Sequence, residues 1–311
     1  MHSIFIDGRN GTTGLRIAER LARRGDIQLL SLPEERRKDP AARKEILNAC
    51  DVALLCLPDP AAIEAVEMIE NPAVRVLDTS TAHRTAPGWV YGFPELSPEQ
   101  RAKILESNRI AVPGCHASGF IALAAPLVRA GILPKDALLT CHSITGYSGG
   151  GKKMIAEYED GSRGVQLDAP RQYGLSQGHK HLPEMQAMTG LDNAPIFCPI
   201  VSDFYSGMVV TIPLFASQLA SDTSVADIES AYRAAYPGPV VVYNDVSAAG
   251  FLAGNAAAGT DRMHICVQGN ADRILLTAAY DNLGKGASGA AVQLLNLILG
   301  ANETEGLEGI I

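Results

Sequence analysis

Short apolar runs alternate with amphipathic stretches over roughly the first hundred residues. The runs, each long enough for one strand, are 3–6, 27–32, 51–58 and 74–80. The stretches between them, 15–25, 40–49 and 60–70, repeat their apolar residues at helical spacing. Because nearly continuous apolar strands alternate with helices, this part is predicted to form an α/β domain around a parallel sheet covered on both faces.

The pattern changes after residue 115. A long helix is expected from about 118 to 130, and the Gly- and Ser-rich segment 148–178 is expected to be a long functional loop with short elements. Strand-like stretches occur at 136–148, 196–202, 207–215, 239–243, 263–268 and 273–280, with one helix at about 224–235. Several strands with one intervening helix predict an α+β domain with a mostly antiparallel sheet.

The last apolar helix, within 286–300, is expected to pack back against the first domain. The predicted division is therefore 1–114 with 284–311 for one domain and 115–283 for a catalytic and oligomerisation domain. Two domains are also what a chain of 311 residues leads us to expect.

Charge and composition narrow the class of protein. A net charge of −8 provides no general basic surface, so nucleic-acid and anionic-membrane partners are not expected. No apolar run reaches the roughly 18–20 residues that span a bilayer, and the N-terminus lacks the features of a signal peptide. The six cysteines are scattered without a CxxC pair, which favours a reducing compartment over disulfides or structural zinc. We expect a cytoplasmic protein without a metal centre.

A glycine-rich turn follows the first predicted strand. The stretch FIDGRNGTTGLRI supplies Gly8, Gly11 and Gly14 at GxxGxxG spacing before a helix. Such glycines let the backbone approach a pyrophosphate at a helix N-terminus, and the hydroxyls of Thr12 and Thr13 could add donors. This context predicts a Rossmann-type dinucleotide-binding site, and the alternative is a tight turn that binds no ligand.

The residues after the second strand favour NADP over NAD. NAD sites usually place an acidic residue there, whereas this chain has Ser31 at that position, followed by Arg36, Arg37 and Lys38. A hydroxyl and guanidinium groups suit a 2′-phosphate. For any one of the basic residues, a solvated charged loop is an equally good interpretation.

Cys115 lies in PGCHASGF, between a Pro-Gly turn and a predicted helix. A helix N-terminus stabilises negative charge and so favours a reactive thiolate, while Gly114 and Gly119 leave room for a substrate. The alternative is a small buried core residue, which is the interpretation we give to the other five cysteines. The flanking turn and polar neighbours favour a nucleophile.

Two histidines could act as its proton partners. His179 and His181 in GHKHLPE would point to the same side of an extended strand, and Glu184 could orient one imidazole. A zinc pair is the alternative, but no third suitable ligand lies nearby in sequence. The remaining histidines are interpreted as surface or structural residues: His2, His83, His116, His142 and His264.

Taken together, these motifs resemble those of one family. DGRNGTTG, PGCHASGF, GHKHLPE and DNLGKGASGAAVQLLN occur in this order, with LDTSTAHR and YGFPELS between the first two. The chain resembles the shorter form of the N-acetyl-γ-glutamyl-phosphate reductases and, more distantly, the aspartate-semialdehyde dehydrogenases. The resemblance implies NADPH-dependent reduction of an acyl phosphate through a cysteine thioester, in arginine biosynthesis. The chain departs from the longer form at His116, where a Tyr-Pro-Thr-like run is common.

The same resemblance assigns roles to individual residues. It makes Cys115 the nucleophile and gives His179 and His181 acid–base and substrate-orienting roles, without deciding which does which. It also implies that Asn282 lies near the cofactor. The residues implied or considered for the substrate and its phosphate are Ser80, Arg84, Lys152, Lys153 and Glu184. Independently of the resemblance, the glycines around Lys285 allow either a phosphate contact or tight helix packing.

Three functions remain open at this point. The first is reduction of N-acetylglutamyl phosphate, and the second is the same chemistry on aspartyl phosphate or a lysine-pathway analogue. The third is a non-catalytic NADP-binding regulator. The GHKHLPE segment favours the first, because the aspartyl enzymes have a different histidine context. The partner is expected to be a small-molecule substrate, in a homodimer or homotetramer.

Overall fold

The computed structural model describes residues 1–310. The chain divides into two compact units, each of which has its own sheet. Unit 1 consists of 1–94, 98–113 and 287–307, and unit 2 of 95–97, 114–286 and the segment that begins at 308. Within residues 1–310, no helix is long and apolar enough to cross a bilayer.

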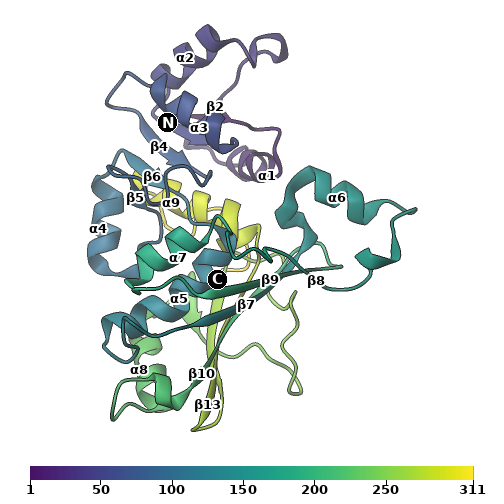
Figure 1. The fold of residues 1–311 in the computed structure, drawn as a ribbon. Helices are drawn as coiled ribbons and strands as arrows, with labels where there is room; N and C mark the ends of the chain where they lie inside the picture. Colours follow the sequence, from purple (N-terminus) through teal and green to yellow (C-terminus); the bar gives the residue numbers. More distant parts are fainter. Residues whose placement is uncertain (311) are drawn as a thin grey trace. The chain divides into compact units, whose positions relative to one another are not determined.

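Unit 1 is built on a six-stranded parallel sheet of order β2-β1-β3-β4-β6-β5. Its strands are β1 (His2–Asp7), β2 (Ile27–Leu30), β3 (Val52–Leu55), β4 (Arg75–Asp78), β5 (Val90–Tyr91) and β6 (Arg109–Ala111). Its helices are α1 (Thr12–Leu21), α2 (Pro40–Ala49), α3 (Asp59–Glu67), α4 (Pro98–Glu106) and α9 (Gly289–Leu299), and the 3₁₀ turn η1 (Glu34–Arg36) follows β2. A second 3₁₀ turn, η2 (Pro94–Leu96), lies where the chain passes from unit 1 into residues 95–97 of unit 2. The expected parallel sheet is confirmed (Figure 1).

Two apolar clusters cover the two faces of this sheet. Successive residues of β1 point to opposite faces: Ile4 and Ile6 join one cluster with α1 and α9, and Phe5 joins the other with α2 and α3. Helix α9 packs against α1, α4 and β4, as the apolar pattern of its sequence predicts. Strand β1 lies between β2 and β3, so the order in which successive strands are added to the sheet reverses beside β1. In open α/β sheets, ligands bind at such a switch point.

Unit 2 is built on a seven-stranded sheet of order β11-β12-β13-β10-β7-β9-β8. Its strands are β7 (Thr140–Gly146), β8 (Arg171–Gln172), β9 (Ile196–Ser202), β10 (Met208–Phe215), β11 (Val241–Tyr243), β12 (Met263–Gly269) and β13 (Arg273–Tyr280). Its helices are α5 (Cys115–Arg129), α6 (Gly151–Glu159), α7 (Leu182–Thr189) and α8 (Val225–Ala235). Its short turns are η3 (Tyr147–Gly150), η4 (Val165–Leu167) and η5 (Ala216–Gln218), and the π-helical turn η6 (Gly284–Ser288) follows β13.

The second sheet is mostly antiparallel, as predicted. Among the strand pairs that the structure describes in this second sheet, only β11 with β12 and β7 with β9 run parallel. Helix α5 packs against β10 and β13, and α7 and α8 pack against α5 (Figure 1). Two expected bounds need correction. The helix expected from about 118 begins at Cys115, and the strand expected over 239–243 forms only from Val241. The short elements expected within 148–178 include the nine-residue helix α6.

Candidate active site

The glycine turn of unit 1 has room for glycine alone at two positions. Gly8 has φ +85°, and a Cβ there would lie 2.2 Å from the carbonyl oxygen of Cys56. A Cβ at Gly14 would lie 2.6 Å from the carbonyl oxygen of Gly8. The first glycine therefore permits the turn, and the second lets α1 begin directly against it.

This turn borders a cavity of about 800 Å³ at the carboxyl end of β1. Gly8 and Gly11 line it, together with Ser31 and Arg37 from the segment after β2. Among the residues described, Thr12, Thr13, Gly14 and Arg36 fall outside this lining. The guanidinium of Arg36 instead lies 3.5 Å from Asp39. The cavity has the size of a cofactor site, and four cationic residues line it: Arg9, Arg37, Lys38 and Arg43. Such cations suit phosphate groups.

Arg43 is a lining residue that the sequence analysis missed. It comes from α2, is mostly buried, and its guanidinium lies 2.9 Å from the Asp7 carboxylate at the end of β1. A second carboxylate, that of Glu64, lies 3.5 Å away. No local pattern indicates this role, because the contact depends on how α2 folds back over β1.

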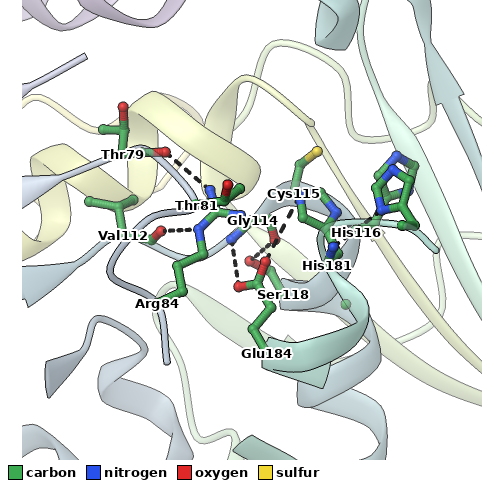
Figure 2. A network of polar contacts seen from close by, with 12 residues as sticks. Thr79, Thr81, Arg84, Val112, Gly114, Cys115, His116, Ser118, His181 and Glu184 are labelled. Atoms are coloured by element: carbon green, nitrogen blue, oxygen red, sulfur yellow. Dashed lines mark hydrogen bonds and ion pairs between the residues drawn. The ribbon is translucent and has the colours of Figure 1, made fainter. Parts of the chain in front are cut away.

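The DTSTAHR segment forms a buried polar network of its own. The carboxylate of Asp78 is fully buried, accepts a 2.6 Å hydrogen bond from the Ser80 hydroxyl and lies 2.6 Å from Nδ1 of His83. Arg84 donates to the carbonyls of Val112 (3.0 Å) and Thr79 (3.1 Å), as Figure 2 shows. These bonds hold the segment after β4 in one conformation.

In unit 2, Cys115 is the first residue of α5, where the sequence predicted it just ahead of a helix, and it is partly exposed. The preceding residue, Gly114, is the N-cap of α5, so the N–H groups of the first turn of this helix lie beside the Cys115 thiol. Four of the other thiols are less suited to react: burial raises the pKa of Cys50 and Cys266 to about 11 and that of Cys56 to about 12. Burial raises the pKa of Cys141 further.

His179 and His181 lie together, with ring centroids 4.8 Å apart. The expected extended strand is wrong, however. Both residues belong to the turn before α7, and His181 has φ −86° and ψ −14° as the N-cap of that helix. His179 is half-buried, and its burial lowers its pKa. His181 is buried, at 4% exposed. The turn, rather than an extended backbone, brings the rings together.

His116, interpreted from sequence as a surface or structural residue, belongs to the same cluster. Its ring lies 5.9 Å from that of His179 and 5.5 Å from that of His181, and Figure 2 shows it next to Cys115. Its Nδ1 lies 2.6 Å from the Ser143 hydroxyl, and its Nε2 lies 2.7 Å from the Tyr173 hydroxyl. The signal that could have identified it is its position directly after Cys115, the candidate nucleophile.

His116 is neutral and Tyr173 is protonated in this environment. Burial lowers the pKa of His116 to about 3, and burial also raises the pKa of the Tyr173 phenol. A neutral imidazole has one donor and one acceptor nitrogen, so the hydroxyls of Ser143 and Tyr173 must take opposite roles toward it. The two hydroxyls are thereby coupled through the imidazole.

Glu184 contacts the start of α5 more closely than it contacts His181. Its buried carboxylate accepts a 3.1 Å hydrogen bond from the N–H of Gly114, whereas its other oxygen is 3.9 Å from Nε2 of His181 (Figure 2). A carboxylate at this position satisfies a first-turn donor and complements the helix dipole.

The remaining candidates lie elsewhere in unit 2. The buried amide of Asn282 accepts from the N–H of Gly207 (2.9 Å) and donates to the Ser148 hydroxyl (3.0 Å). Lys152 and Lys153 are exposed on α6. Lys285 is 1% exposed, and its ammonium lies 2.8 Å from both oxygens of Glu95. Lys285 is therefore engaged in a buried ion pair, whereas the sequence had left open a phosphate contact or tight helix packing. Within residues 1–310, no group of three or more potential ligands could hold a metal ion.

Comparison with known proteins gives consistent matches over both units. A family model described as semialdehyde dehydrogenase, dimerisation domain, matches residues 115–282. A second, described as semialdehyde dehydrogenase, NAD binding domain, matches residues 31–104. N-acetyl-gamma-glutamyl-phosphate reductase 2 of Pseudomonas putida is 46% identical, covering 98% of this chain and 100% of that protein. N-acetyl-gamma-glutamyl-phosphate reductase of Burkholderia orbicola is also 46% identical, covering 96% of this chain and 97% of its own.

The solved structures show the same fold at low identity. Aspartate semialdehyde dehydrogenase II of Vibrio cholerae, complexed with ASA, superposes with a TM-score of 0.72 at 16% identity, covering 96% of this chain and 98% of that one. Aspartate semialdehyde dehydrogenase of Candida albicans, with NADP, gives a TM-score of 0.66 at 15% identity, covering 97% of this chain and 99% of that one.

Proposed function

The chain belongs to the semialdehyde dehydrogenase family, where its relatives are N-acetyl-γ-glutamyl-phosphate reductases, and we propose that it acts in arginine biosynthesis. The proposed reaction is the NADPH-dependent conversion of N-acetyl-L-glutamyl 5-phosphate into N-acetyl-L-glutamate 5-semialdehyde and inorganic phosphate. The family resemblance predicted from the sequence is thus confirmed. The observation that carries the proposal is a partly exposed cysteine at a helix N-terminus beside clustered histidines, in a chain 46% identical to such reductases over nearly its whole length.

Cys115 is the proposed nucleophile. Its sulfur attacks the acyl carbon, the bond from that carbon to the phosphate oxygen breaks, and inorganic phosphate leaves, so that a thioester remains. The first-turn N–H groups of α5 can stabilise the oxyanion that forms on the way. The residues that line the cavity of unit 1 would hold NADPH, which would supply the hydride that reduces the thioester. The products would then be the semialdehyde and the regenerated thiolate of Cys115.

We propose His179 as the general acid and base and His181 as the residue that orients the substrate. His179 is accessible, and burial lowers its pKa, so its imidazole is neutral and able to take up a proton at neutral pH. His181 is nearly sealed from solvent at the start of α7, which suits a fixed contact. Ser80 and Arg84, which the resemblance implies, and Lys152 and Glu184, which were considered from the residues themselves, stay predictions as substrate residues.

NADP is the proposed cofactor of unit 1. The cavity at the glycine turn is lined by Ser31 and Arg37 at the end of β2, where an NAD site would have an acidic group. Arg9 and Lys38 add positive charge to the same wall. Asn282 stays a prediction as a cofactor residue. Unit 1 would then be the dinucleotide-binding domain, and unit 2 the catalytic and oligomerisation domain.

A homodimer or homotetramer through the open face of the seven-stranded sheet is the proposed assembly. By strand register, four exposed apolar side chains share this face: Ile144, Ile196, Phe215 and Leu275. The family model over this unit is described as a dimerisation domain. We also propose a cytoplasmic location, which agrees with six cysteines that form no disulfide within residues 1–310.

The test is the reverse reaction, phosphate-dependent reduction of NADP⁺, with N-acetylglutamate semialdehyde compared against aspartate semialdehyde. The proposal predicts a clear preference for the acetylated substrate and, in the Cys115→Ser variant, loss of turnover by orders of magnitude with NADP binding retained. A preference for aspartate semialdehyde would identify an aspartyl enzyme instead. NADP binding without turnover on either aldehyde would identify a regulator.

A further inference from the structure

A buried tyrosine reaches into the first turn of the helix that carries Cys115. Tyr280 is the last residue of β13, and its side chain is fully buried. Its hydroxyl lies 2.5 Å from the carbonyl oxygen of Cys115 and 3.0 Å from the backbone nitrogen of Gly119. In an α-helix, the carbonyl of one residue and the N–H four residues later are natural partners. The phenol of Tyr280 therefore bridges the carbonyl of Cys115 and the N–H of Gly119, four residues later in α5.

The direction of both hydrogen bonds follows from the groups involved. The N–H of Gly119 can only donate, so the phenol oxygen accepts there and its single proton goes to the carbonyl of Cys115. Burial raises the pKa of the phenol, which keeps that proton in place. The result is a chain from N–H through O–H to O=C, in which each bond strengthens the next.

Gly119 is what makes room for this hydroxyl. A Cβ at position 119 would lie 2.6 Å from the Tyr280 hydroxyl and 2.6 Å from Cγ2 of Val210. Distances below 3.0 Å require something to shift. The glycine four residues after the cysteine, noted in the sequence as space for a substrate, thus also admits a side chain of the protein itself.

The segment that begins at Tyr280 contacts Cys115 a second time. A Cβ at Gly286, in the π-helical turn after β13, would lie 3.0 Å from Cβ of Cys115. Between the two contacts, Asp281 holds the segment: its carboxylate accepts from the Ser206 hydroxyl (3.0 Å) and from the N–H of Gly259 (2.6 Å). Cys115 is therefore held at its carbonyl and approached at its Cβ by one braced stretch of chain.

We propose that Tyr280 is a positioning residue for Cys115, whose hydroxyl sets the orientation of the Cys115 peptide and of the first-turn N–H groups of α5. This inference rests on the proposed function only for Cys115 as the nucleophile. The orientation matters because those N–H groups stabilise the thiolate and the oxyanion, and both effects depend strongly on geometry. Displacement of reacting groups by about 1 Å can cost a factor on the order of 10² in rate.

Two other tyrosines provide matched controls, because their hydroxyls also donate to carbonyls of α5. Tyr232 donates to Leu123 (2.7 Å), and Tyr236 donates to Ala122 (2.6 Å). The residue four positions after Ala122 is Pro126, which has no N–H, so the Tyr236 hydroxyl serves a carbonyl that lacks its helical partner. Both bonds lie about two turns beyond Cys115. Like the bond of Tyr280, each joins a tyrosine hydroxyl to a carbonyl of α5, but at a position farther along the helix.

The experiment compares Tyr280→Phe with Tyr236→Phe and Tyr232→Phe. We would measure kcat and KM for the acyl phosphate, thermal unfolding, and the alkylation rate of Cys115 by iodoacetamide as a function of pH, followed by mass spectrometry of its peptide. In Tyr280→Phe we expect kcat to fall by about 10–100-fold with KM nearly unchanged, and the midpoint of the alkylation profile to move to higher pH. The two controls should keep kcat and the profile within about twofold of the native chain.

Equal effects of the three substitutions on kcat and alkylation would overturn the proposal, because the bond would then act on stability alone. Gly119→Ala is the second variant, in case Tyr280→Phe does not fold. The added Cβ would displace the Tyr280 hydroxyl. This variant should therefore also lower kcat with KM nearly unchanged. An unchanged alkylation profile of Cys115 would count against a positioning role of Tyr280. Alkylation needs no acyl phosphate, so this result stands even if the substrate assignment fails.

Discussion

The Glu184 carboxylate accepts a hydrogen bond from the N–H of Gly114, the residue before Cys115, at 3.1 Å. Both groups are buried, so the N–H has no access to water when the carboxylate is removed. The contact joins the start of α7, which His179 and His181 precede, to the start of α5, whose first residue is Cys115. This hydrogen bond explains the glutamate of GHKHLPE more directly than the 3.9 Å distance between Glu184 and Nε2 of His181 does.

Glu184→Ala should therefore lower the free energy of unfolding by about 1–3 kcal/mol, the cost of an unsatisfied buried donor. Glu184→Gln keeps an acceptor oxygen and should lose less. Urea unfolding measures both, with Glu70→Ala as the control, because that exposed carboxylate pairs with Lys44 at the surface and should change stability little. Equal losses for the alanine and glutamine variants would show that charge, and not the hydrogen bond, matters there.

His116 should make stability depend on pH between about 3 and 6.5. Its pKa is lowered from 6.5 to about 3 in the folded chain, so the unfolded chain binds the extra proton as pH falls below 6.5. Stability from this residue is then constant above 6.5 and decreases at lower pH, by about 1.4 kcal/mol per pH unit.

The measurement is the difference in unfolding free energy between the native chain and His116→Gln at pH 7 and pH 5.5. The difference should shrink by roughly 1 kcal/mol at the lower pH, because glutamine does not titrate. A difference independent of pH would mean that His116 is not buried in its neutral form. His179→Gln is a useful companion, since burial lowers that pKa as well.

Much of the fold could be predicted because its signals are local. The apolar runs of unit 1 lie on strands buried on both faces, such as Val52–Leu55, and the glycine turn occupies one short segment. Cys115 was predicted just ahead of a helix because its Pro-Gly turn precedes it directly, and the helix begins at Cys115 itself. In each case the physical cause lies within a few residues of the feature.

The contacts that complete the site depend instead on residues distant in sequence. His116 bonds to Tyr173, 57 positions away, and Lys285 pairs with Glu95, 190 positions away. The spacing of apolar and polar residues along the sequence does not predict such distant pairs. The extended strand predicted at His179 failed for a local reason, because Pro183 favours the first turn of a helix and the chain turns before it.

Lys285→Met should destabilise the chain without weakening phosphate binding. Lys285 is 1% exposed, so its removal leaves the Glu95 carboxylate largely buried without its ammonium partner, at a cost of roughly 3–5 kcal/mol. The double variant with Glu95→Gln should recover part of that loss, which a double-mutant cycle in urea would quantify. A raised KM for phosphate in the reverse reaction with unchanged stability would support the phosphate role considered from the sequence.

Ser31→Asp should shift cofactor preference from NADPH toward NADH. Ser31 lines the cavity after β2, and a carboxylate there would repel a 2′-phosphate while offering an acceptor to a ribose hydroxyl. A penalty of about 1–3 kcal/mol corresponds to a roughly 5- to 150-fold rise in the Kd for NADPH. Isothermal titration with both cofactors measures the change directly, without need of the acyl phosphate.

The basic residues of the same segment provide the matched comparison. Arg37 lines the cavity, whereas Arg36 lies at the surface with its guanidinium 3.5 Å from Asp39. Arg37→Ala should therefore weaken NADPH more than NADH and reduce the salt dependence of binding, while Arg36→Ala should leave both affinities nearly unchanged. The opposite ranking would mean that the segment Glu34–Arg37 changes conformation when the cofactor binds, since the exposed ion pair of Arg37 with Glu34 at 3.1 Å costs little to break.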